Sequence, residues 1–379
     1  MLSTLNASDA TLSWPAKAER IAEEIERHAS VHDRDDTFVA EGFEALKREG
    51  FFAALVPGEL GGGGASLAEM CEAIRIIASA CGSTALAFSM HCHLVAVSAW
   101  RWKHQNAPTD ALLKRVAAEH LILVSSGGSD WLNSGGTLVK VDGGYLVNAR
   151  KPFASGSVIG DMLVTSAVYD DPEDGATVLH FAVPLNAEGV EHQPTWLVLG
   201  MRGTGSNDVV ITDYFLPDSA VSGRRKAGPW HMLFHVISKM AFTFVYAAYL
   251  GVAERARSEA MRAAASRAPN VSTAQLAGEL ENELLSARLA HEQMVRLAEE
   301  AAPGPETTSS AMACRTLVGR HCIAAVTKAM ELAGGGAFYR RNLIERAFRD
   351  VQAARFHPLQ EKPQTEFSGK VALGWDIDG

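Results

Sequence analysis

The sequence predicts an α+β fold with a helical N-terminal domain (residues 1–120), a central antiparallel β domain (residues 121–221) and a C-terminal four-helix bundle (residues 222–379). Two observations support this order. Apolar residues recur at helical spacing in both outer thirds of the chain, whereas the middle third alternates apolar and polar residues between turn signals. A chain of 379 residues is also long enough for two or three domains.

The N-terminal third reads as a series of helices. Trp14–Gly50 is amphipathic and ends at a glycine, and helical spacing returns over Ser66–Glu119. Within it, the apolar segment Ala85–Trp102 carries His91 and His93, which are two residues apart and therefore point to different faces. A helical pair of metal ligands needs a spacing of four, so we expect no metal site; either histidine is a weak candidate for a pocket wall.

The middle third predicts successive β-strands. Gly136–Asn148 alternates around Asp142-Gly143-Gly144, which indicates a hairpin. Because further strands follow with short turns, we expect an antiparallel sheet or flattened barrel. These strands are predicted at Met162–Tyr169, Thr177–Pro184, His192–Leu199 and Asp208–Leu216.

The last third predicts the bundle. Phe234–Arg257 is apolar on nearly every side, which is typical of a helix buried among others, and it includes Tyr246, a weak candidate for the substrate pocket. Three more helices are predicted at Val271–Glu300, Ser309–Ala333 and Arg341–Arg355.

Composition limits the class of protein. A net charge of −9 argues against nucleic acid as a partner, because neutralising phosphates needs excess Lys and Arg. The five cysteines form no CxxC pair, the N-terminus has no signal-peptide pattern, and no uncharged run is long enough to span a bilayer. We therefore expect a cytoplasmic protein with no membrane partner.

Three loops of the β region are rich in glycine and small hydroxyl residues: Ser125–Asp130, Lys151–Ser157 and Gly200–Ser206. Loops of this kind at strand ends let backbone N–H groups approach a planar heterocycle or a phosphate. On loop chemistry alone, turns of a β-sandwich explain them equally well. A GxGxxG motif after a strand and a GxSxG motif are both absent, so a Rossmann domain and an α/β-hydrolase are not predicted.

Four ordered stretches together resemble the acyl-CoA dehydrogenase superfamily over about the whole chain, and its order of domains is the one predicted above. They are Phe43–Pro57 with Leu60-Gly-Gly62, Lys151-Pro-Phe-Ala-Ser155, Gly200–Ser206 with Val210–Pro217, and Glu345-Arg-Ala-Phe-Arg-Asp350.

The resemblance implies a flavin, FAD or FMN. Phe153 would lie beside the isoalloxazine ring and Ser155 would hydrogen-bond near its N5 atom. Ser125, Ser126 and Ser129 occupy the loop that contacts the pyrimidine edge and the phosphates in the family, although the family's Glu-Pro is missing here.

The resemblance also implies an oligomer. Gly334 and Gly335 match a glycine pair that a neighbouring subunit presents to the cofactor, so at least a dimer and usually a tetramer is expected. The family grips the adenosine diphosphate of FAD with Arg-x-x-Phe-Gly. Here the stretch is Arg267–Val271, without that pattern, so FMN competes with FAD.

The family's catalytic base is missing. Its glutamate would align with Pro358 or with Ala241, and neither is a carboxylate. Next to the first position stands His357, which resembles the C-terminal histidine of the reduced-flavin-dependent monooxygenases of this fold. An imidazole can donate and accept a proton near neutral pH, so His357 is the predicted catalytic acid/base.

The preferred interpretation is therefore a two-component monooxygenase that uses O2 and takes reduced flavin from a partner reductase to act on a small organic substrate. An acyl-CoA dehydrogenase with Glu331 or Glu366 as its base is the first alternative. A non-catalytic flavin- or ligand-binding member of the fold is the second.

Overall fold

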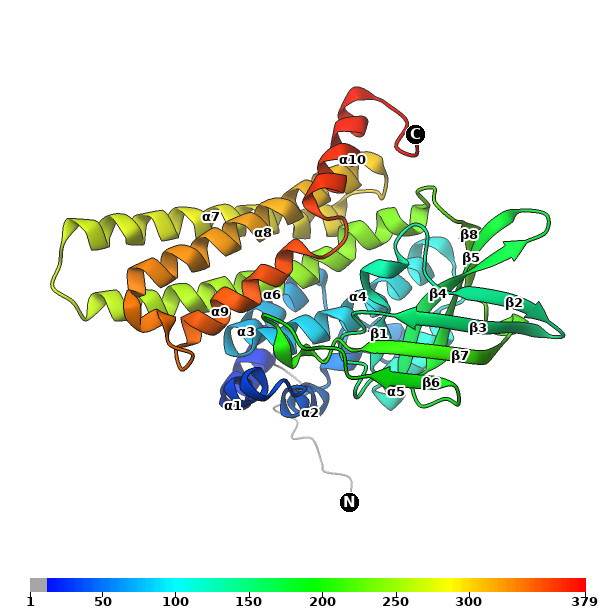
Figure 1. The fold of residues 1–379 in the computed structure, drawn as a ribbon, viewed down its shortest axis with the longest axis horizontal. Coiled ribbons are helices and arrows are strands. Elements are labelled where there is room, and N and C mark those ends of the chain that lie inside the picture. The colour runs from blue at the N-terminus through cyan, green and yellow to red at the C-terminus, as the bar shows by residue number, and fades with distance from the viewer. Residues whose placement is uncertain (1–11) are drawn as a thin grey trace, which may run out of the picture.

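The computed structural model describes residues 12–379 and has helices at both ends of the chain around one sheet (Figure 1). The predicted fold class is confirmed, with a helical N-terminal region, a central sheet and a C-terminal helical region. The N-terminal region contains α1 (Trp14–Asp35), α2 (Ala40–Arg48), α3 (Leu67–Ala80), α4 (Gly82–Gln105) and α5 (Asp110–Glu119).

The amphipathic segment expected over Trp14–Gly50 forms two helices. Asp36 ends α1 in the left-handed conformation (φ 53°), and its carboxylate accepts a hydrogen bond from Arg202 at 2.5 Å. This contact ties the end of α1 to the loop before β7.

The sheet has eight strands: β1 (Leu123–Ser125), β2 (Thr137–Val141), β3 (Gly144–Lys151), β4 (Met162–Asp171), β5 (Gly175–Pro184), β6 (Val190–Gln193), β7 (Asp208–Pro217) and β8 (Gly223–Lys226). The strand order is β6-β7-β3-β2-β4-β5-β8, and β1 pairs with β4.

The sheet is mixed and not purely antiparallel. β4 runs parallel to both β1 and β2. The reason is the loop between β3 and β4, which crosses to the far side of β2 instead of forming a hairpin. Two boundaries also differ from expectation: β6 ends at Gln193, and β8 pairs with β5, so the sheet extends beyond residue 221, where we expected it to end.

The C-terminal region consists of α6 (Met232–Ala265), α7 (Val271–Glu300), α8 (Pro305–Ala333), α9 (Leu343–Val351) and the additional helix α10 (Glu361–Leu373). α6 packs against α7, α8 and α9, which makes the four-helix bundle. α6 is long and apolar enough to cross a membrane, but 94% of its most apolar window is buried inside the protein, which is typical of a core helix.

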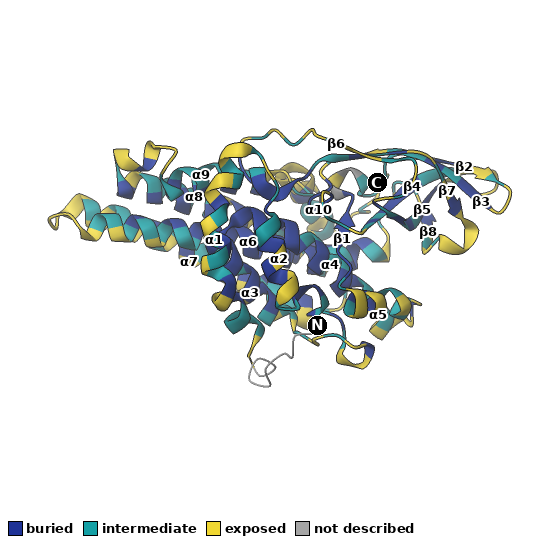
Figure 2. Ribbon diagram, turned by 90° about the horizontal axis from the view of Figure 1, so that it is seen from below, coloured by how far each residue is buried: buried dark blue, intermediate teal, exposed yellow. Residues whose placement is uncertain are grey.

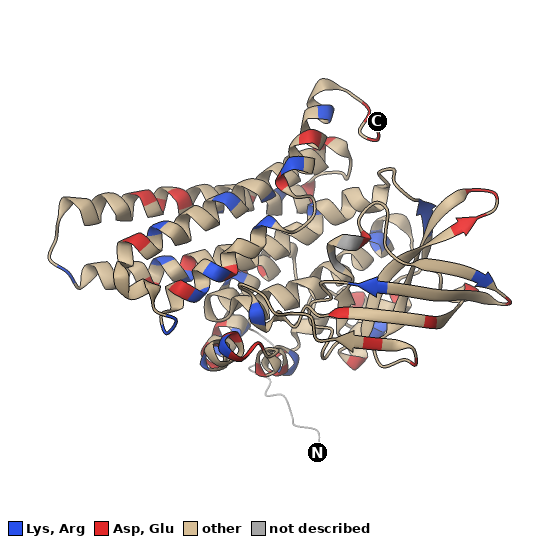
Figure 3. Cartoon of the chain, in the orientation of Figure 1, with Lys and Arg blue, Asp and Glu red and all other residues tan. Residues whose placement is uncertain are grey.

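Burial is deepest where α6 crosses α3 and α4, and exposure is concentrated at helix ends and hairpin tips (Figure 2). Charges of both signs are interspersed along the outer helices (Figure 3).

Candidate active site

A cavity lies between α4, the first half of α6 and the inner side of the sheet, and its volume is about 320 Å³. Two short loops complete its wall: residues 125–131, which follow β1, and His357-Pro358, which follow α9. The cavity therefore combines elements from all three regions of the chain. A volume at the lower end of the range for ligand pockets suits a small molecule.

Asp130 holds the 125–131 loop in place through a buried ion pair. Its carboxylate accepts a hydrogen bond from Lys151 Nζ at 2.6 Å, and no part of the Lys151 side chain is exposed. The Ser126 hydroxyl donates to the same carboxylate, as does Thr165 at 2.9 Å. Two of the glycine- and serine-rich loops predicted from the sequence are thus joined at the cavity wall.

The loops Lys151–Ser157 and Gly200–Ser206 are joined by hydroxyl groups. Ser155 Oγ lies 2.7 Å from Ser206 Oγ, which lies 2.7 Å from Thr204 Oγ1. The backbone N–H of Gly156 also donates to the Thr204 carbonyl at 2.9 Å. All three loops therefore form one connected scaffold beside the cavity.

The predicted flavin residues fall into two groups. Ser125 and Ser126 line the cavity, whereas Phe153 and Ser155 do not. Phe153 is 57% exposed and meets Trp196 edge to face, with ring centroids 5.9 Å apart. The side chain of Ser129 lies outside the described part of the structure.

Gly128 explains how the first loop reaches the C-terminal segment. A Cβ at this position would lie 2.8 Å from Pro358 Cγ, closer than normal van der Waals contact. Only glycine permits this approach, which brings the 125–131 loop beside His357.

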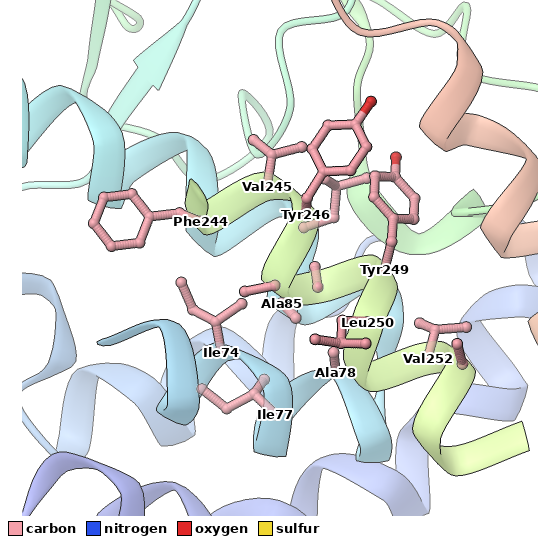
Figure 4. Close-up of a cluster of buried hydrophobic side chains, with 14 of the residues drawn as sticks. Ile74, Ile77, Ala78, Ala85, Phe244, Val245, Tyr246, Tyr249, Leu250 and Val252 are labelled. Carbon is pink, nitrogen blue, oxygen red and sulfur yellow. The ribbon is translucent and has the colours of Figure 1, made fainter. Parts of the chain in front are cut away.

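His357 lies on the cavity wall and is half-buried. Its Nε2 atom is 2.6 Å from the hydroxyl of Tyr249, whose side chain is fully buried. Figure 4 shows the hydroxyls of Tyr246 and Tyr249 projecting from the same side of α6, away from Ile74 and Ile77 in the core.

Burial, together with the nearby Arg315 guanidinium, lowers the pKa of His357 to about 3. The imidazole is therefore neutral at pH 7. Burial raises the pKa of Tyr249 well above its ordinary value, so the phenol keeps its proton. We assign Tyr249 as the donor to Nε2, because the reverse assignment would leave a buried O–H without an acceptor. The second nitrogen of His357, Nδ1, then carries the proton and makes no hydrogen bond within residues 12–379.

Two weak pocket candidates are structural instead. His91 Nε2 donates to the Phe52 carbonyl at 2.8 Å, and its Nδ1 accepts from the Leu123 N–H at 3.1 Å. Tyr246 donates to the Ala354 carbonyl at 2.6 Å. Neither residue lines the cavity, because both side chains are fully used in joining elements of the core. His93, by contrast, is in the wall, and burial lowers its pKa to about 4.

Gly334 and Gly335 lie at the end of α8 and do not line this chain's cavity. Arg267 is hydrogen-bonded there: its guanidinium donates to the carbonyls of Leu332, at 2.9 Å, and Ala333. This arginine caps α8 and does not extend a free fork toward a ligand.

The two positions at which the resemblance places the family's glutamate base both line the cavity. They are Ala241 on α6 and Pro358, so neither can remove a proton. Among the described residues, the only carboxylate in the wall is Asp130, which is neutralised by Lys151. Glu331 and Glu366 are outside the wall and form ion pairs with Lys328 and Lys370.

Comparison with protein families matches three consecutive domains of acyl-CoA dehydrogenases: the N-terminal domain at residues 16–107, the middle domain at 125–214 and the C-terminal domain at 243–361. The chain belongs to the acyl-CoA dehydrogenase family.

Its relatives within the acyl-CoA dehydrogenase family differ in activity. YdbM of Bacillus subtilis, whose name assigns it provisionally to the acyl-CoA dehydrogenases, is 29% identical and covers 93% of this chain and 94% of its own. A dibenzothiophene monooxygenase of Rhodococcus erythropolis is 29% identical over 64% of this chain and 60% of its own. The solved structure of KijD3 in complex with FMN and a dTDP-linked amino sugar superposes with a TM-score of 0.88, is 26% identical, and covers 97% of this chain and 96% of KijD3.

Sequence reasoning missed several residues of this site. Tyr249 falls within the buried helix predicted at Phe234–Arg257, where no pattern marks it as functional. Lys151 belongs to the Lys151–Ser155 motif, but the motif alone assigns it no role. Asp130 gave one signal, since it ends the serine- and glycine-rich loop that the sequence singles out. Arg101 and Trp131 also line the cavity, but no sequence pattern marks either of them.

Proposed function

We propose that this chain is a reduced-flavin-dependent monooxygenase that uses FMN and O2 to oxygenate a small organic substrate. One observation carries the proposal: among the described residues the only carboxylate in the cavity wall is Asp130, which is paired with Lys151, and the same wall contains a neutral histidine, His357. The removal of an α-proton from an acyl thioester has no base here.

The residues present fit a flavin. Ser125 offers a hydroxyl, and the glycine-containing backbone after it offers N–H groups, to a heterocycle edge or a phosphate, while Ser126 holds this loop through its hydrogen bond to Asp130. Phe153, with Trp196 beside it, offers an exposed apolar surface for the ring system. Bound reduced flavin supplies the two electrons that activate O2.

FMN is favoured over FAD by Arg267. The family's arginine in this stretch serves the adenosine diphosphate, but here the guanidinium is held by two carbonyl oxygens at the end of α8. The KijD3 structure with FMN supports the same choice. A difference in affinity between FMN and FAD, measured by fluorescence quenching, tests this assignment directly.

His357 is proposed as the catalytic group that donates a hydrogen bond into the cavity. Tyr249 occupies Nε2, so the N–H of Nδ1 remains available to an oxygen atom that gains negative charge during the reaction. With a pKa of about 3, the ring supplies this donor without a full positive charge. The surrounding apolar residues of α6 exclude water from the same region.

The proposal includes a partner protein, a location and an oligomeric state. A separate reductase would supply reduced flavin, and the protein would work in the cytoplasm. A homotetramer, or at least a dimer, would bring Gly334 and Gly335 of a neighbour to the cofactor. Light scattering of the flavin-loaded protein tests the last point, and a monomer at micromolar concentration would contradict it.

The test of the function is His357→Ala, with His321→Ala as the control. His321 lies on α8, where it pairs with Glu283 outside the cavity. With chemically reduced FMN and a substrate found by screening, His357→Ala should lower oxygenation by about 10²–10⁴-fold while FMN affinity and the circular dichroism spectrum stay unchanged. His321→Ala should retain activity. Equal activity in the two variants would exclude a catalytic role for His357.

A further inference from the structure

The cavity has two ends, set by the antiparallel packing of α4 and α6. The start of α4 lies against Val252, because a Cβ on Gly82 would be 2.7 Å from that side chain. Because the two helices are antiparallel, residues later in α4 lie beside residues nearer the N-terminus of α6. Val245 and Leu233 both line the cavity, and their separation of twelve positions along α6 corresponds to about 18 Å. His357 lies at the Val245 end, close to Tyr249.

Arg101 marks the opposite end. It lies two turns beyond His93 on α4 and is half-buried in the wall, and its guanidinium makes no hydrogen bond or ion pair within residues 12–379. Burial lowers its pKa, and its charge in turn contributes to lowering the pKa of His180 and His231. An unpaired guanidinium in a partly desolvated wall lacks the partner that such groups normally have.

No neighbouring group supplies this partner. Arg225 is itself cationic and donates to the carbonyls of Trp131 and Leu132, and the carboxylate of Asp130 is already neutralised by Lys151. This end of the cavity therefore carries uncompensated positive charge.

Trp131 adds an independent signal. Its ring lines the cavity and packs against Phe234, with centroids 4.9 Å apart. Its indole Nε1 is buried and has no hydrogen-bond partner. Because an indole N–H is a donor only, it needs an acceptor that the described residues do not provide.

We propose that Arg101 and Trp131 form a subsite for an anionic group of the substrate, a carboxylate, sulfonate or phosphate. The inference rests on the proposed function, in which this cavity binds the substrate. The anionic group would occupy the Arg101 end, and the atom to be oxygenated would lie toward His357. A guanidinium and an N–H donor are the chemistry that recognises oxyanions, and neither is needed for a neutral hydrocarbon.

The experiment uses the full flavin-free chain and inorganic phosphate as the probe. The thermal unfolding midpoint is measured against phosphate concentration at constant ionic strength, with chloride as the balancing ion. The wild type should show saturable stabilisation. Arg101→Gln should raise the half-saturating concentration at least tenfold, and Trp131→Phe should raise it about fivefold, since it removes the N–H and keeps the ring.

Arg115→Gln is the control, because Arg115 is an exposed arginine paired with Glu119 on α5. It should bind phosphate as the wild type does. An unchanged half-saturating concentration in Arg101→Gln, or an equal loss in Arg115→Gln, would overturn the subsite.

A second arm separates a substrate anion from the phosphate of the cofactor. FMN and riboflavin affinities are measured for the wild type and Arg101→Gln. The proposal predicts no change in either, and no competition between phosphate and FMN. A tenfold loss of FMN affinity with riboflavin unchanged would assign the arginine to the cofactor and contradict the proposal. The reaction of bound reduced FMN with O2 in the wild-type protein without substrate tests the proposed function separately.

Discussion

Replacing Lys151 by Met should destabilise the protein strongly, because this side chain is fully buried and has three acceptors. Its Nζ atom lies 2.6 Å from Asp130 Oδ1, from the Gly135 carbonyl and from the Ser166 carbonyl. Methionine fills a similar volume but leaves the Asp130 carboxylate without its charge partner. Breaking a buried ion pair from one side costs about 3–5 kcal/mol.

Urea unfolding at pH 7, followed by circular dichroism, measures this loss. Lys140→Met is the matched control on the neighbouring strand β2, since Lys140 forms an exposed ion pair with Asp218 and its loss should cost far less. Adding Asp130→Asn to Lys151→Met should recover part of the loss, because it removes the uncompensated charge. Equal, small losses in the two lysine variants would refute the idea that this pair holds the cavity loop.

Two further predictions concern the histidines. Tyr249→Phe removes the hydrogen bond to His357 Nε2 and frees the ring to change tautomer. Oxygenation should therefore fall by about tenfold while the fold is retained, and steady-state assays with reduced FMN measure this loss. His91 and His291 are buried with pKa values lowered to about 4, below the ordinary 6.5, so the unfolded chain takes up protons first as the pH falls. The free energy of unfolding should therefore decrease between pH 6.5 and pH 4, by up to about 1.4 kcal/mol per histidine and pH unit, and a pH-independent value in urea titrations would contradict this.

The helices and most strands could be predicted from the sequence because their signals are local. The predicted bounds of Val271–Glu300 match α7, and the hairpin turn at Asp142-Gly143-Gly144 separates β2 from β3. The parallel pairing of β4 could not be predicted, because it depends on where a loop crosses the sheet. The pairing of β8 with β5 could not be predicted either, because it depends on where the chain returns to the sheet.

The site shows the same difference between features with a local sequence signal and features that depend on distant residues. His357, Ala241 and Pro358 were found by resemblance to a motif, and all three line the cavity. The hydrogen bond between Tyr249 and His357 joins residues 108 positions apart, and no local pattern distinguishes such a tyrosine from its neighbour Tyr246, which is structural.

The most direct test of the central claim is an anaerobic titration of the oxidised, FMN-loaded wild-type protein with acyl-CoA thioesters of several chain lengths. The cavity has no carboxylate base at Ala241 or Pro358, so the flavin absorbance should not bleach, whereas chemically reduced protein should react with O2 on admission of air. Rapid bleaching of the flavin by an acyl-CoA would contradict the account and show that the chain is a dehydrogenase.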